Sequence, residues 1–180
     1  MLKIIVPGAD YFNEETSTFE TVDDFELELE HSLISLSKWE SRFKKPFLTS
    51  DEKSTEEVLA YVEAMSLSPI YPQDIFDRIS AENMIRIRGY IESSESATTF
   101  GVMPERKGRG EIITAELIYY WMVAFTIPFE CETWHLNRLF ALIRICNIKN
   151  SKPKKMSRNE IAQRNRDLNA QRRAKYGTNG

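Results

Sequence analysis

The chain has 180 residues, 42% hydrophobic and 11% aromatic, which is enough apolar material for one core of ordinary size and excludes a wholly disordered protein. Its net charge of −3 conceals an asymmetry. Residues 149–180 hold ten Lys and Arg against two acidic residues, so this basic tail carries +8 and residues 1–148 carry −11. The asymmetry bears on partners, because a basic appendage attracts acidic proteins or phosphate backbones.

The sequence predicts neither membrane insertion nor secretion. The longest apolar run, Leu117 to Ile127, has eleven residues, which is about half of the roughly 20 that a helix needs to cross a bilayer. The first residues lack the apolar region and cleavage site of a signal peptide, so we expect a cytosolic chain. Cys131 and Cys146 lie near apolar segments, which favours buried, reduced thiols over a disulfide framework.

Residues 1–30 have the pattern of β-structure. Apolar stretches are separated by a Pro7-Gly8 turn and by a polar turn at 14–17. From 25 to 30, apolar residues alternate with acids, a period of two that places the acids on the solvent face of a strand. We therefore predict a small antiparallel β-sheet with one buried face.

Residues 31–148 are predicted to be mostly helical. The apolar period changes at Ser32, and the resulting helix ends before Pro46. Three aromatic side chains should anchor this helix to the core: Trp39, Phe43 and Phe47.

Capping signals predict the next helices. Ser54 and Glu57 have the spacing of a capping box, which predicts a helix to about Ser66. Two short helices are expected after Pro69 and Pro72, over 73–79 and 81–91, the second capped by Ser80. A mobile loop is expected over 93–110, where polar residues give way to Pro and Gly.

The most apolar part of the chain follows this loop. Thr114 can cap a helix to Phe125 that is apolar nearly all round, as a central core helix is. An amphipathic stripe from Leu136 to Cys146 predicts a second helix, to about Asn147, that packs against the first. The predicted fold class is α+β: a globular domain over 1–148 followed by a basic helical tail.

The basic tail is predicted to be a helix with little to bury. Ser157 and Glu160 form a second capping box for a helix to about Tyr176, which Gly177 ends. Its large apolar residues are Ile161, Leu168 and Tyr176 alone, so the helix is expected to form fully on a partner.

Residues that could carry catalysis are few. Cys131 and His135 share a helical spacing that suits a metal-ligand pair or a Cys-His dyad, but a second histidine would have to come from distant His31. Gly108-Arg109-Gly110 lacks the ending of a phosphate-binding loop. We predict no catalytic, cofactor or metal site, and interpret Cys131 and His135 as structural residues.

The tail is the stronger candidate for binding. Its arginines resemble an arginine-rich helix that contacts a nucleic-acid backbone, but the same pattern suits docking on an acidic protein or on another copy. With one aromatic residue, Tyr176, the tail offers no stacking platform for single strands, so protein docking is favoured. The candidate residues in the tail are Arg158, Arg164, Arg166, Arg172 and Arg173.

Several motifs resemble proteins encoded among the tail genes of long-tailed bacteriophages, and the resemblance spans nearly the whole chain. The motifs are His31-Ser32-Leu33, Lys45-Pro46-Phe47-Leu48, Glu111-Ile112-Ile113-Thr114, Tyr119-Tyr120-Trp121, Ile127-Pro128-Phe129-Glu130-Cys131, Trp134-His135-Leu136-Asn137-Arg138-Leu139 and the ending from Pro153 to Gly177.

The resemblance implies a tail assembly chaperone, a non-enzymatic protein that coats the hydrophobic tape-measure protein in the host cytoplasm before the tail-tube protein polymerises. It brings no catalytic residues or cofactors. Such a chaperone needs exposed apolar surface for a helical client, and Trp134, Tyr119 and Phe100 are the candidates. Self-association is a further expectation. The alternatives are a structural subunit of the virion (tail, connector or capsid-associated), docked through the basic tail, and a nucleic-acid-binding protein.

Overall fold

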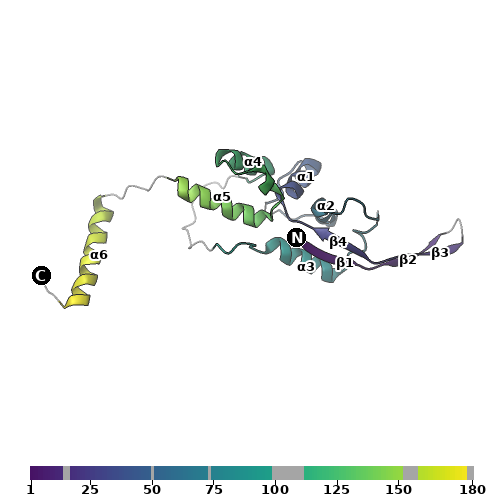
Figure 1. Ribbon diagram of the computed structural model, residues 1–180, viewed down its shortest axis with the longest axis horizontal. Helices are drawn as coiled ribbons and strands as arrows, with labels where there is room; N and C mark the ends of the chain where they lie inside the picture. The colour runs from purple at the N-terminus through teal and green to yellow at the C-terminus, as the bar shows by residue number, and fades with distance from the viewer. Residues whose placement is uncertain (14–16, 50, 73, 99–111, 152–157, 178–180) are drawn as a thin grey trace. The chain divides into compact units, whose positions relative to one another are not determined.

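The computed structural model describes residues 1–13, 17–49, 51–72, 74–98, 112–151 and 158–177 (Figure 1). They divide into two compact units, Met1–Asn147 and Ile148–Gly180. The first unit opens with antiparallel β-structure and continues with helices, which confirms the predicted α+β class. No helix in the described ranges is long and apolar enough to cross a membrane.

Two antiparallel strand pairs follow one another along a single ribbon. Strand β1 (Leu2–Val6) pairs with β4 (Phe25–Leu29), and β2 (Ala9–Asn13) pairs with β3 (Thr18–Val22). Gly8 lies at the break between the two pairs, and its backbone N–H donates to Asp24 Oδ1 at 2.7 Å. A Cβ atom at Gly8 would lie 2.2 Å from the carbonyl oxygen of Val22, so the close approach requires glycine.

The inner face of the β1–β4 pair forms the floor of the first hydrophobic core. Ile4, Val6, Leu27 and Leu29 are at most 1% exposed there. The predicted solvent face is confirmed for residues 26 and 28, whose carboxylates both pair with Lys3.

For Glu30 that prediction is wrong. Its carboxylate accepts a hydrogen bond from Tyr90 Oη at 2.6 Å and pairs with the Met1 amino group at 2.7 Å. Tyr90 belongs to a later helix, and the periodicity of the sequence does not predict that this helix contacts the ribbon. Glu30 is therefore part of a half-buried polar contact.

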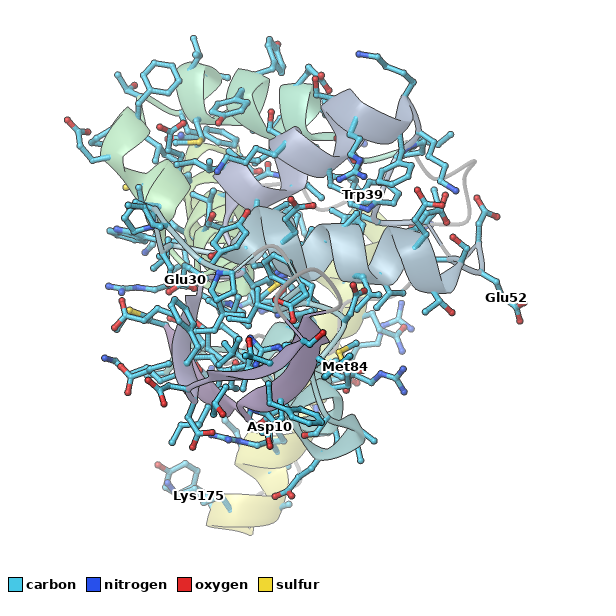
Figure 2. All side chains as sticks on the ribbon, turned by 90° about the vertical axis from the view of Figure 1, so that its right-hand side faces the viewer. Asp10, Glu30, Trp39, Glu52, Met84 and Lys175 are labelled. Atoms are coloured by element: carbon cyan, nitrogen blue, oxygen red, sulfur yellow. The ribbon has the colours of Figure 1, made fainter. Side chains whose placement is uncertain are left out.

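Three capped helices pack on this core: α1 (Leu33–Phe43), α2 (Thr55–Met65) and α3 (Ala81–Glu92). The predicted caps at Ser54 and Ser80 are confirmed. Trp39 lies where α1 meets α2, and its indole N–H donates to the Glu57 carbonyl at 2.8 Å (Figure 2). Residues 74–78 form turns instead of the predicted helix. Their backbone hydrogen bonds, such as the one from the Ile75 N–H to the Pro72 carbonyl oxygen, link residues three positions apart, whereas an α-helix links residues four positions apart.

A second hydrophobic core joins α1 to α4 (Ala115–Ala124), the short 3-10 helix η1 (Phe129–Thr133) and α5 (Leu136–Asn150). Thr114 caps α4 as predicted. The expectation that α4 is central is wrong, since Tyr120 and Val123 are 65% and 62% exposed. The core reaches only the face of α4 that carries Ile118 and Met122.

The second unit contains α6 (Arg158–Tyr176), and Gly177 follows it with φ of 62°. Its helical extent agrees with the prediction, while the predicted Ser157–Glu160 capping box lies outside what is described. Of the predicted loop, 93–98 has no regular secondary structure, and 99–110, with Phe100, lies outside the described residues.

Candidate partner-binding site

An apolar groove lies between α2 and α3 and has a volume of about 170 Å3. Val58 comes from α2, and Met84 (labelled in Figure 2) and Ile91 come from α3. Phe47 and Tyr61 complete the lining with two rings stacked at 3.8 Å between centroids. The two capped helices thus leave between them a space that their own side chains do not fill.

The charged residues that line the groove are both cationic. Lys53 Nζ lies 4.8 Å from the centre of the Phe47 ring, and Arg88 is an exposed residue of α3. None of the described residues that line the groove is acidic. On a unit with net charge near −11, two cations beside an apolar groove favour an occupant that carries a carboxylate next to an apolar group.

The size of the groove indicates what kind of occupant it accepts. Small-molecule sites usually enclose about 300–1,000 Å3, and this groove has about 170 Å3. That volume suits one or two side chains of a partner protein. A groove between two helices that receives apolar side chains at helical spacing is the usual recognition mode for an amphipathic helix.

A buried polar network lies directly behind the groove. Tyr61 Oη is 2.6 Å from His31 Nδ1, and the His31 ring meets the His135 ring at 5.1 Å between centroids. His135 Nε2 lies 3.0 Å from the Tyr90 carbonyl oxygen, while its Nδ1 accepts from the Asn137 backbone N–H. Since a carbonyl only accepts, Nε2 is the nitrogen of His135 that donates in this contact.

Burial sets the protonation of this network. Desolvation, with a smaller contribution from nearby His135, lowers the pKa of His31 to about 4. Burial likewise raises the pKa of Tyr61. His31 and Tyr61 are therefore neutral near pH 7, and the network joins the groove wall to the segment in which α3 ends.

Cys131 and His135 do not form the reactive pair that their spacing could have produced. Both ring nitrogens of His135 are engaged as described above, and its ring packs on His31 and Tyr90. Burial raises the pKa of the Cys131 thiol, which disfavours the thiolate. Across the described ranges, no group of three or more His, Cys, Asp and Glu side chains could hold a metal ion.

Tyr119 and Trp134, the candidates from the central region, are half-buried against the second core. Tyr119 Oη donates to Glu132 at 2.8 Å, and the Arg138 guanidinium stacks 4.2 Å above the Trp134 ring. Their exposed neighbours Tyr120 and Phe129 are more accessible to a partner, at 65% and 55% exposure. The partner-binding role expected of Tyr119 and Trp134 stays a prediction.

The five candidate arginines all lie on α6, away from the groove residues in sequence and in a separate compact unit. All five are exposed. They are distributed around the helix, so α6 presents a basic surface with Ile161 and Leu168 exposed within it.

Sequence reasoning missed the α2–α3 groove. The spacing of Met84, Ile87 and Ile91 was a usable signal, since these residues share one helical face. Nothing in the spacing shows that this face is incompletely covered by α2.

Comparisons of the chain with protein-family models, with curated proteins and with solved structures each found no match.

Proposed function

We propose that this chain is a non-enzymatic assembly protein that holds an amphipathic helix of a client in the groove between α2 and α3. The observation that carries the proposal is an unfilled apolar groove of about 170 Å3 whose charged lining residues, within the part of the chain that is described, are Lys53 and Arg88. The client helix would insert one or two large apolar side chains and place acidic residues beside the two cations.

The resemblance of the sequence motifs to phage tail genes supplies the client. Under this proposal the chain is a tail assembly chaperone, and the client is the tape-measure protein before the tail-tube protein polymerises around it in the host cytoplasm. A long apolar helix needs such cover, because an exposed apolar stripe otherwise drives aggregation. Further exposed apolar residues, among them Tyr120, Val123 and Phe129, extend the surface available for this role.

Co-expression with the tape-measure protein of the same tail gene cluster tests the groove. The chain should keep that protein soluble and co-purify with it. Replacing both cations, with Lys53→Glu and Arg88→Glu, should reduce the co-purified client at least tenfold, because two favourable charge contacts become repulsive. Lys38→Glu makes the same kind of change on the exposed surface of α1 and should leave the yield unchanged. Equal yields from all variants would remove the groove from the proposal.

A second candidate is a structural subunit of the virion that docks through its tail. The separate basic helix α6, with its exposed side chains, favours it. Quantitative mass spectrometry of infected-cell lysate and purified particles separates the two functions. A chaperone is abundant in the lysate and absent from particles, whereas a subunit keeps a fixed integer ratio to the major tail protein.

A third candidate, nucleic-acid binding through α6, is favoured by the arginines alone. Binding to phosphate backbones weakens steeply with salt and should be retained by an isolated α6 peptide. Negligible affinity of the full chain for DNA and RNA at about 150 mM salt would exclude this candidate.

A further inference from the structure

The outer half of the ribbon, β2 with β3, presents two aromatic rings to solvent. Phe12 and Phe19 are directly opposite in the strand register, with ring centroids 5.2 Å apart. They remain 54% and 74% exposed. The described side-chain contact between this half and the helical region is the hydrogen bond from Tyr11 Oη to Asp74.

Such a pair is costly to leave uncovered. A two-stranded ribbon is marginally stable in water unless another element covers it, and each buried aromatic ring removes about 150–250 Å2 from water. Neither β2 nor β3 pairs with a third strand in the described part of the chain. The Phe12–Phe19 face therefore has the properties of a docking surface.

Charge indicates what covers it. The ribbon, residues 1–30, contains nine acidic residues and one Lys, a net charge of −8. No Lys or Arg occurs between residues 4 and 37. The basic tail, residues 149–180, carries +8, so the two segments match in magnitude with opposite sign.

The tail also offers an apolar complement. Ile161 and Leu168 are seven residues apart, so they share one face of α6, and they are 46% and 39% exposed. Arg172 and Lys175 lie on the same face at helical spacing. This face of α6 thus combines a short apolar stripe with cations, as the ribbon combines two aromatic rings with acids.

We propose that α6 of one copy docks on the Phe12–Phe19 face of a second copy. The opposite charges of the two segments and their exposed apolar side chains make the two surfaces complementary.

The contact joins two different surfaces, so a pair of copies keeps one free ribbon and one free α6. Heterologous contacts of this kind propagate into rings or filaments. Because the attraction is largely between exposed charges, it should weaken with salt as the screening length shortens to about 3 Å at 1 M. Self-association of this type is independent of the groove proposed to hold a client.

Two chains with opposite defects test the proposal. One carries Phe12→Ser with Phe19→Ser, and the other carries Arg172→Glu with Lys175→Glu. Sedimentation of nuclease-treated wild type at low salt should show oligomers that grow with concentration and dissociate at high salt. Each defective chain alone should be monomeric. A mixture should form a 1:1 heterodimer and nothing larger, because one intact ribbon and one intact α6 remain.

Matched controls keep the test specific. Arg166→Glu with Arg173→Glu makes the same charge change on the opposite side of α6, and Ile85→Ser removes an exposed apolar residue from α3. Both controls should still form the large oligomers. Monomeric wild type, assembly that disappears with nuclease, or equal disruption by the controls would each overturn the proposal. Retained client binding by the α6 variant would separate this outcome from any failure of the groove.

Discussion

The two halves of the β-ribbon share antiparallel strand pairing but have opposite environments. In the β1–β4 half, Ile4 and Leu27 are at most 1% exposed, while in the β2–β3 half Phe12 and Phe19 are more than half exposed. The free edge of β1 is covered by α3, whose Asn83 and Arg86 side chains donate to the Ile5 and Lys3 carbonyl oxygens. The outer half has no comparable cover from the described helices.

This difference shows that strand formation and strand burial have separate causes. Alternation and turns are enough to pair the strands in both halves. Burial depends on which helices reach each face, and α3, for example, reaches β1 through Asn83 and Ile5, which are 78 positions apart in the chain. An uncovered half that keeps large aromatic side chains is typical of a surface that another molecule covers.

The largest effect is expected from two neighbouring isoleucines. Ile4→Ala should lower the free energy of unfolding by about 2–5 kcal/mol, because it leaves a cavity in the first core. Ile5→Ala, on the outer face where Ile5 is 60% exposed, should cost less than about 1 kcal/mol. Urea unfolding of both variants measures the difference. Similar losses would mean that the two faces of β1 are equally buried.

The sequence was sufficient for the elements whose causes are local. Ser54, Ser80 and Thr114 begin their helices where capping chemistry places them, and the two-residue period predicts strand β4. The extent of α6 also followed from its pattern and Gly177.

The failures share a physical reason. Tyr120 and Val123 look like core residues by hydropathy, but no element in the described part of the chain covers that side of α4. In the sequence pattern Glu30 resembles its solvated neighbours, but in the fold it accepts a hydrogen bond from Tyr90 of α3. The groove depends on how closely α2 approaches α3, which no local period encodes. Coverage by distant elements is therefore what the sequence alone did not provide.

Acid should loosen the buried half of the ribbon through the histidine that follows it. His31 has a pKa of about 4 when folded and about 6.5 when unfolded. The unfolded chain therefore binds a proton between these values that the folded chain does not. Stability is complete above pH 6.5 and falls as the pH is lowered toward 4, by about 3 kcal/mol from this group.

Urea unfolding from pH 7 to 4.5 measures this loss, and His31→Gln is the control. Because many carboxylates also titrate, the informative quantity is the difference in slope between wild type and His31→Gln. The variant should have the shallower dependence on pH. Amide protection factors, which correct for the slower intrinsic exchange in acid, should fall in β1 and β4 as the pH is lowered, while those of β2 and β3 should be low throughout. Parallel slopes for the two proteins would show that His31 is not the group responsible.

The smallest effect is expected at the covered edge of β1. Asn83 Nδ2 donates to the Ile5 carbonyl oxygen at 2.8 Å, and Asn83→Ala leaves that carbonyl without this donor. The loss should be about 1 kcal/mol, partly offset because alanine favours the helix more than asparagine does. Ile85→Ala, on the exposed side of the same helix, changes helix propensity without touching the ribbon. Asn83→Ala should unfold at a lower urea concentration than Ile85→Ala, and its β1 amides should exchange faster. This result would show that the cover of the β1 edge by α3, in addition to side-chain burial, makes the β1–β4 half more stable than the β2–β3 half.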